Sequence, residues 1–157
     1  MPTTSVLERS VEIEAPVEEV FAFHLDTRNA ALISPRSTRI LDVQGTFPVT
    51  TGSRVVMRMR PFPSPVAMSW RVRIETVEPP GRIVDVAERS PFASWRHEHI
   101  FQALGPGRTL MTDRLTYALP GGPLGRLADR LVAGRQLARA FAERQRLTKE
   151  LLEGRTG

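Results

Sequence analysis

Residues 94–118, SWRHEHIFQALGPGRTLMTDRLTYA, contain the pattern that decides the fold of this chain. Two stretches in which apolar and polar residues alternate, 94–103 and 108–118, flank the short segment LGPG at 104–107. Alternation with a period of two predicts strands with one buried face, and glycine and proline between two such strands predict a tight turn. The sequence therefore predicts an antiparallel hairpin at this point of the chain.

Further strands and helices surround this hairpin. Alternating patterns predict five more strands, over residues 5–13, 38–44, 54–60, 68–77 and 82–88. The spacing of apolar residues predicts two short helices between the first two strands, one opening after Pro16 and one over residues 29–33. After the glycine- and proline-rich segment 119–123, the chain is predicted to be helical to about residue 153.

The last helical segment carries an apolar stripe that we expect to pack against a sheet. Its members recur mostly at steps of three or four residues: Leu124, Leu127, Leu131, Ala138, Phe141 and Leu152. Strands joined by short turns make an antiparallel sheet, and a single amphipathic helix must cover one face of it. A large sheet twists and curls, so its concave face can wrap that helix. The predicted fold is α+β: a curved seven-stranded antiparallel sheet that wraps around a long C-terminal helix, with two short helices between strands 1 and 2.

The composition limits the chemistry that the chain can perform. Its 157 residues fit one domain, residues 1–157. Cysteine is absent from the sequence, which excludes disulfides, thiolate catalysis and cysteine-ligated metals. The N-terminal residues show no signal peptide, and no apolar run approaches the roughly 18 residues of a membrane span. We therefore expect a cytoplasmic protein with no stable membrane insertion.

The basic charge raises binding to nucleic acid or to a membrane surface as a hypothesis, but its distribution weakens both. Of the 22 basic residues, 21 are arginine, and the formal net charge is +5. Residues 121–157 carry eight basic and four acidic residues, whereas residues 1–120 carry fourteen and thirteen. The acidic residues are interspersed as on a solvated helix face, and no nucleic-acid reader motif accompanies them. We expect no nucleic-acid partner.

Several pieces of the sequence, taken in order, are similar to one known superfamily. They are IEAP at 13–16, VF at 20–21, the turn at Gly52, VEPP at 77–80, Phe92, WRHEHIF at 95–101, TDRLTY at 112–117 and LPGGPLG at 119–125. Their order and spacing resemble the START, polyketide cyclase and Bet v 1-like helix-grip domains (SRPBCC) over nearly the whole chain. The resemblance implies a helix-grip fold with a small-molecule cavity, in a superfamily that includes lipid carriers, quinone binders and aromatase/cyclases.

The two hairpin strands carry a concentrated set of ionisable side chains. With a period of two, His97 and His99 share one face with Trp95 and Phe101, and the two aromatic residues mark that face as the buried, concave one. Pairing of Ala103 with Thr109 would set Phe101 opposite Met111, His99 opposite Asp113, His97 opposite Leu115 and Trp95 opposite Tyr117. Directly opposed residues lie about 4.5–5.5 Å apart at Cβ. A hydrogen bond between His99 and Asp113 is therefore within reach.

Three interpretations of this His–Asp pair stay open. It could be structural, with Asp113 orienting His99 and the pair fixing the register of the hairpin. It could instead supply the polar anchors of an apolar cavity, or it could be catalytic, with His97 or His99 as a general base. The H-x-H spacing would also suit a metal, but the remaining histidine, His24, is predicted to end an apolar helix face. We expect no metal and no cofactor.

We expect a binding protein more than an enzyme. The predicted partner is a small hydrophobic or amphipathic molecule, such as a lipid, a quinone or a polyketide-like aromatic. The alternative is a polyketide cyclase or hydrolase that uses the His–Asp pair. The expected ligand-binding residues are Met57, Met59, Trp70, Asp85, Trp95, His97, His99, Phe101, Met111, Asp113, Tyr117 and Phe141.

Overall fold

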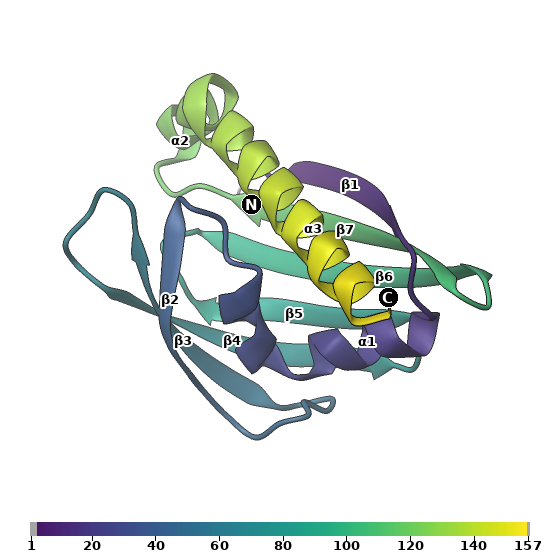
Figure 1. Cartoon of the computed structure of the whole chain (residues 1–157). Coiled ribbons are helices and arrows are strands. Elements are labelled where there is room, and N and C mark those ends of the chain that lie inside the picture. The colour runs from purple at the N-terminus through teal and green to yellow at the C-terminus, as the bar shows by residue number, and fades with distance from the viewer. Residues whose placement is uncertain (1–2, 157) are drawn as a thin grey trace.

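Seven antiparallel strands form one curled sheet in the computed structural model, which describes residues 3–156 (Figure 1). The strands are β1 (Ser5–Ile13), β2 (Thr38–Gln44), β3 (Arg54–Pro61), β4 (Met68–Glu78), β5 (Arg82–Arg89), β6 (Ser94–Gly105) and β7 (Arg108–Ala118). Their order across the sheet is β1-β7-β6-β5-β4-β3-β2, so β5 is central and β1 and β2 are the edges. Each neighbouring pair is antiparallel, as the sequence predicts.

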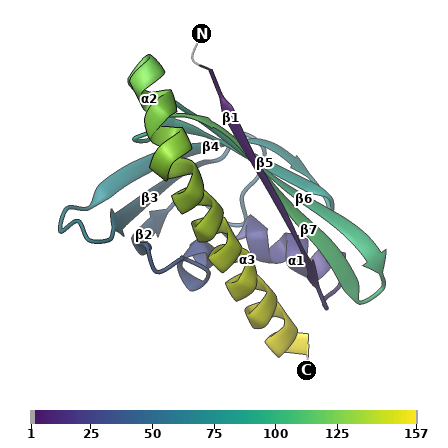
Figure 2. The same cartoon turned by 90° about the horizontal axis from the view of Figure 1, so that it is seen from above.

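The helices lie on the concave side of this sheet. The helix α1 (Val17–Leu25) and the 3₁₀ helix η1 (Thr27–Leu32) connect β1 to β2. After β7 the chain forms α2 (Gly122–Ala128), a π-helical turn η2 (Asp129–Ala133) and the long helix α3 (Gly134–Thr156). Seen from above, α3 runs obliquely across the sheet close to β1 (Figure 2). Within residues 3–156 no helix has the length and apolar character needed to cross a bilayer. The predicted helix-grip fold is confirmed.

The predicted register of the β6–β7 hairpin is confirmed at every position. Ala103 pairs with Thr109, His99 with Asp113 and Trp95 with Tyr117. This register places His97 and His99 on the concave face and their neighbours Arg96 and Glu98 on the convex face.

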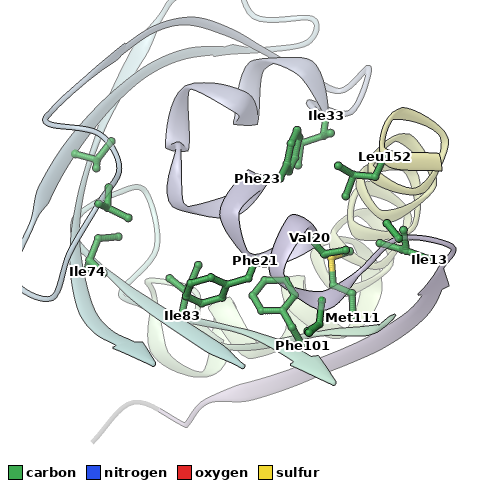
Figure 3. Close-up of a cluster of buried hydrophobic side chains, with 14 of the residues drawn as sticks. Ile13, Val20, Phe21, Phe23, Ile33, Ile74, Ile83, Phe101, Met111 and Leu152 are labelled. Carbon is green, nitrogen blue, oxygen red and sulfur yellow. The ribbon is translucent and has the colours of Figure 1, made fainter. Parts of the chain in front are cut away.

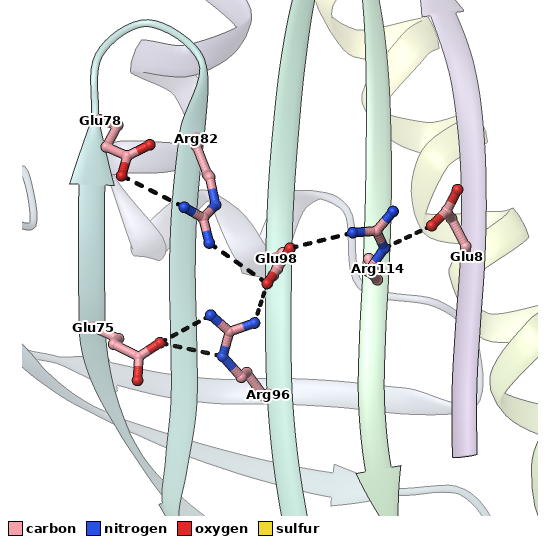
Figure 4. Close-up of polar contacts among 7 residues, drawn as sticks. All are labelled: Glu8, Glu75, Glu78, Arg82, Arg96, Glu98 and Arg114. Atoms are coloured by element: carbon pink, nitrogen blue, oxygen red, sulfur yellow. Dashed lines mark hydrogen bonds and ion pairs between the residues drawn. The ribbon is translucent and has the colours of Figure 1, made fainter. Parts of the chain in front are cut away.

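The convex face carries a ladder of ion pairs across five strands (Figure 4). Glu98, whose side chain is only 12% exposed, lies at its centre and pairs with Arg96, with Arg82 at 3.6 Å and with Arg114 at 3.8 Å. The hydrogen bond from Arg96 holds the pKa of Glu98 below its ordinary value. Acidic residues on the outer strands complete the ladder: Glu75 pairs with Arg96, Glu78 with Arg82 and Glu8 with Arg114.

The apolar core is divided into two clusters. The larger one lies under α1 and contains the residues drawn in Figure 3, among them Ile13, Phe21, Phe101 and Leu152. Phe21 and Phe101 meet edge to face, with ring centroids 5.8 Å apart. The smaller cluster contains Leu115, Tyr117 and Phe141, with Leu7, Phe92, Trp95 and Leu137 packed around them.

The predicted apolar stripe of the last helix is wrong in its first part. Leu124, Leu127 and Leu131 are 77%, 53% and 62% exposed, whereas Phe141 and Leu152 are buried. The π-helical turn explains the difference, because it inserts one extra residue and rotates the preceding helix by about 100° relative to the following one. The residues that face the sheet are consequently Gly125, Asp129, Gly134, Ala138, Phe141 and Gln145, with a step of five at the π turn.

Asp129 holds the rotated segment against the sheet, and Gly125 packs against the loop that precedes it. Asp129 accepts hydrogen bonds from Tyr117 at 2.6 Å and from Ser5 at 2.5 Å. Gly125 is buried so close to the chain before it that a Cβ atom there would lie 2.3 Å from the carbonyl oxygen of Pro120. A side chain at position 125 is therefore excluded by sterics.

The helix stripe yields a test with a matched pair of variants. Phe141→Ala is expected to lower the free energy of unfolding by about 3–5 kcal/mol, because it opens a cavity in the smaller apolar cluster. Leu131→Ala on the exposed side of the same segment is expected to change it by less than about 0.5 kcal/mol. Urea denaturation of both variants measures the difference, and similar losses in the two would contradict the assigned faces.

Candidate functional site

Four ionisable side chains meet in the middle of the concave face. They are Asp85 on β5, His97 and His99 on β6, and Asp113 on β7, and we refer to them as the tetrad. His97, His99 and Asp113 are buried, and the side chain of Asp85 retains 16% of its exposure. The tetrad separates the two apolar clusters: the ring of His97 lies 5.1 Å from that of Phe141, and His99 faces His24 beside Phe101.

The two imidazole rings stack between the two carboxylates. The ring centroids of His97 and His99 are 3.8 Å apart. Asp113 Oδ1 lies 2.8 Å from His97 Nε2 and 3.5 Å from His99 Nδ1. Asp85 Oδ2 lies 3.0 Å from His99 Nε2 and 3.8 Å from His97 Nδ1. Each carboxylate therefore faces a nitrogen of both rings.

The hydrogen bonds of the tetrad run diagonally across the sheet. Asp113 is directly opposite His99 but bonds to His97, and Asp85 is directly opposite His97 but bonds to His99. The contact expected between His99 and Asp113 is present at 3.5 Å without being the hydrogen bond. Diagonal neighbours are within reach of long side chains, and here the diagonal choice ties β5, β6 and β7 to one another.

Gln145 on α3 connects the tetrad to the long helix. Its Nε2 donates to Asp113 Oδ2 at 2.7 Å and to the carbonyl oxygen of Arg9 on β1 at 2.8 Å. Sequence reasoning missed this residue. Its signal was a polar side chain four residues after Phe141, at a position that the apolar face of the helix occupies.

The electrostatics of the tetrad favour ionised carboxylates and a neutral His99. Burial opposes ionisation of Asp113, but the hydrogen bond and charge of His97, with the charges of His99 and Arg144, hold its pKa well below the ordinary value. The same balance, with the hydrogen bond from His99, lowers the pKa of Asp85. Burial and the neighbouring His97 lower the pKa of His99. The charge of Arg144 on α3 thus lowers the pKa of both carboxylates.

His24 on α1 extends this ionisable group. Its Nδ1 lies 2.8 Å from the carbonyl oxygen of Val20, which fixes the imidazole as a donor at that atom. Burial, followed by the charge of His99, lowers the pKa of His24 to about 3. His24 is therefore neutral at physiological pH.

Except for Phe101, the aromatic residues predicted for the site gather at one side of the tetrad. Trp70 and Trp95 meet edge to face with ring centroids 4.9 Å apart, and Phe92 packs 5.6 Å from Trp70. Tyr117 lies beside Phe92, but its hydroxyl binds Asp129, and its pKa rises to about 12 through burial and that bond. Phe92 is a site neighbour that the predicted set did not include.

The remaining predicted residues lie elsewhere on the same concave side. Phe101 and Met111 are part of the larger apolar cluster, Met57 packs against it, and Met59 is half-buried on β3. One cavity of about 290 Å³ lies where β7 meets α2, beside Ser5, Arg126 and Asp129. The other, of about 580 Å³, is a wide depression of the surface between Arg9, Arg36, Ala142, Glu143 and Arg146. None of the twelve predicted ligand-binding residues lines either of these two cavities.

The tetrad also contains a donor set that could hold a metal. One ligand atom each from Asp85, His97 and His99 lie within 4.8 Å of one another. Two imidazoles and a carboxylate are typical ligands of zinc or non-haem iron. Two of these ligand atoms, His99 Nε2 and Asp85 Oδ2, lie 3.0 Å apart and are hydrogen-bonded to each other.

Comparison with known proteins identifies the family. Residues 4–153 match the sequence profile of the family described as polyketide cyclase/dehydrase and lipid transport. The chain belongs to this family. The membership confirms the predicted START, polyketide cyclase and Bet v 1-like superfamily. Comparison with curated protein sequences gives no match.

Solved structures share the fold of this chain at low sequence identity. TTHA0849 of Thermus thermophilus is 15% identical with a TM-score of 0.77, over 98% of this chain and 100% of that one. The di-domain aromatase/cyclase StfQ of the steffimycin biosynthetic pathway is 16% identical with a TM-score of 0.76, over 98% and 52%. The Zhui aromatase/cyclase of Streptomyces sp. R1128 is 13% identical with a TM-score of 0.69, over 95% and 96%.

The link from Gln145 to the tetrad can be tested by stability. Gln145→Ala is expected to lower the free energy of unfolding by about 2–3 kcal/mol, because it removes a buried hydrogen bond to a carboxylate. Gln136→Ala, at an exposed position of the same helix, is expected to change it by less than about 0.5 kcal/mol. Equal losses of unfolding free energy in the two variants would show that the hydrogen bond of Gln145 to Asp113 does not stabilise the fold.

The depressed pKa of His24 predicts a specific dependence of stability on pH. The folded pKa of about 3 is below the unfolded value of 6.5, so the unfolded chain takes up the proton first. The stability that depends on neutral His24 is complete above about pH 6.5 and is lost as the pH falls toward 3.

Between about pH 7 and pH 5 this term amounts to about 2 kcal/mol. Urea denaturation at both pH values measures how much unfolding free energy is lost on going from pH 7 to pH 5. This loss is expected to be about 2 kcal/mol smaller in His24→Gln than in the wild type. His99, whose pKa is lowered in the same direction, is present in both proteins and does not contribute to the difference. Parallel losses in the two proteins would show that His24 does not carry the effect.

Proposed function

We propose that the chain binds a small amphipathic molecule on the concave face, with its polar group at the tetrad and its apolar body against Trp70 and Trp95. Unpaired polar atoms carry the proposal. Trp70 Nε1, His99 Nδ1 and Gln145 Oε1 are buried and have no hydrogen-bond partner among residues 3–156. Leaving a buried polar group unpaired costs about 1–3 kcal/mol. His99 Nδ1 and Gln145 Oε1 lie at the tetrad, whereas Trp70 Nε1 lies beside Trp95, so a ligand that extends from one place to the other would supply their missing partners.

The accessibility of Asp85 supports the same location. Asp85 lies on the central strand and bonds to His99, yet its side chain is 16% exposed. Neither of the two described cavities reaches it. For a ligand to reach Asp85, half-buried side chains of the smaller apolar cluster must move aside. Phe92, Trp95 and Leu137 are among them.

The chemistry of the site selects the class of ligand. Edge-to-face aromatic rings favour a flat or extended apolar body, and the ionised carboxylates disfavour a carboxylate or phosphate at the tetrad. A carbonyl group would accept from Trp70 Nε1, and a hydroxyl group on another part of the molecule would donate to His99 Nδ1 or Gln145 Oε1. Among lipids, quinones and polyketide-like aromatics, neutral oxygenated molecules fit this arrangement best.

A second candidate function is that of a cyclase. His99 presents an unpaired, buried Nδ1 while Nε2 donates to Asp85, which is the arrangement of an oriented general base. StfQ and Zhui are both described as aromatase/cyclases. In this function Nδ1 would accept a proton from an acidic carbon or hydroxyl of the bound molecule. Asp85 would then stabilise the resulting imidazolium.

Fluorescence titration tests the binding proposal. The chain has two tryptophans, Trp70 and Trp95, and both lie at the proposed site, so quenching reports on it directly. Decylubiquinone, emodin and palmitoleyl alcohol represent a quinone, a polyketide aromatic and a neutral lipid. At least one of them is expected to bind, and Trp70→Phe is expected to weaken it about fivefold by removing the indole N–H but keeping a ring.

Two further variants complete the experiment. Glu75→Gln, on the convex face, is expected to bind like the wild type. His99→Gln separates the two candidate functions, since a product detected by mass spectrometry with wild type and lost in this variant would identify a cyclase. No quenching by any of the three molecules, or unchanged affinity in Trp70→Phe, would refute binding at this place.

A further inference from the structure

The rotation of α2 and η2 leaves a row of apolar side chains in solvent. Leu124, Leu127 and Leu131 are exposed, and Val132 next to them is 52% exposed. Spacings of three and four residues place the three leucines on one side of the helical segment, away from Gly125 and Asp129, which face the sheet. We call these four residues the leucine ridge. Exposed apolar residues in such a row indicate an interaction surface.

The charge around the leucine ridge is strongly positive. Residues 121–142 contain four arginines, at positions 126, 130, 135 and 139, and a single acidic residue, Asp129. Both oxygens of Asp129 are engaged by Ser5 and Tyr117, so its charge faces the sheet. In the described part of the chain, Arg130, Arg135 and Arg139 are exposed and form no ion pair with Asp or Glu. The segment therefore combines an apolar row with cations that have no local counterion.

We propose that the leucine ridge and its arginines dock this protein onto an anionic lipid bilayer. Leucines that project from a helix lying parallel to a surface, with arginines beside them, are the pattern of an interfacial helix. Anionic headgroups supply the counterions that the arginines lack. A second copy of the chain suits the surface less well, since a symmetric contact would place these arginines against one another.

The position of the ridge connects it to the interior. Asp129 holds η2 to Tyr117, and Tyr117 belongs to the smaller apolar cluster beside the proposed ligand site. In Figure 1, α2 lies at the end of the molecule opposite the β6–β7 hairpin. The docking proposal depends only on the leucine ridge and its arginines. The purpose that we assign to it, the exchange of a neutral amphipathic ligand with the bilayer, rests on the proposed function.

Vesicle flotation tests the docking. Wild type is expected to float with vesicles of phosphatidylglycerol and phosphatidylcholine in equal parts, and to float less at higher salt or with phosphatidylcholine alone. The triple variant Leu124→Ser, Leu127→Ser, Leu131→Ser is expected to bind at least about tenfold more weakly. The variant Leu41→Ser, Leu104→Ser, which removes exposed leucines elsewhere, is the matched control and is expected to bind like the wild type.

A charge variant and two independent measurements complete the design. Arg126→Gln, Arg130→Gln, Arg135→Gln is expected to lose the preference for anionic vesicles, and circular dichroism verifies that each variant is folded. The proposal is overturned if wild type floats with neither kind of vesicle, or if the leucine variant floats as well as wild type. Light scattering that shows a dimer abolished by the leucine variant also overturns it, in favour of self-association.

The docking and the proposed ligand site can fail separately. The leucine variant is expected to keep the tryptophan quenching by decylubiquinone in vesicle-free solution, while Trp70→Phe is expected to keep vesicle binding. Flotation without quenching by any of the three molecules would support docking and refute the ligand site. Quenching without flotation would do the reverse.

Discussion

The crossed hydrogen bonds between two carboxylates and two stacked imidazoles are the constraint on which the rest of the structure depends. Asp85 and Asp113 reach β6 from either side, and each bonds to the histidine diagonal to it. The arrangement exists only in the observed register. A slip of β6 by one residue would turn Arg96 and Glu98 toward the core and His97 and His99 toward solvent. Because Gln145 binds the same Asp113, the placement of α3 depends on this carboxylate as well.

The sequence contained enough information for the sheet and for the composition of its inner face. The length of the turn at 104–107 and the aromatic residues of β6 determine both the register and the direction in which the histidines point. The hydrogen-bond partners within the tetrad were not predictable in the same way. Opposite and diagonal positions are both within reach of an Asp or His side chain, and the choice depends on rotamers that no periodicity reports.

The phase of the last helix is a second feature that the pattern of residues does not reveal. The leucines at 124, 127 and 131 continue the spacing of Ala138 and Phe141, so a regular α-helix would bury all of them. One π-helical turn breaks that continuity, and its cause lies in tertiary contacts: Asp129 binds Tyr117 and Ser5. A short polar contact with the sheet therefore decides which apolar residues face solvent. The same π-helical turn therefore determines both which helix residues face the sheet and which leucines form the ridge.

The contacts of α3 with β1 also have a consequence for assembly. β1 is an edge strand, and its carbonyl groups at Arg9 and Glu12 accept hydrogen bonds from Gln145 and Lys149. Residues three apart on a strand direct their carbonyl groups to opposite sides, so one of these two acceptors lies on the free edge, where a strand from another molecule would otherwise bind. The opposite edge, β2, carries an irregularity between Ile40 and Asp42, which interrupts the flat ladder needed for strand addition. Both edges of the curled sheet thus carry a local feature that opposes the addition of a strand from another molecule.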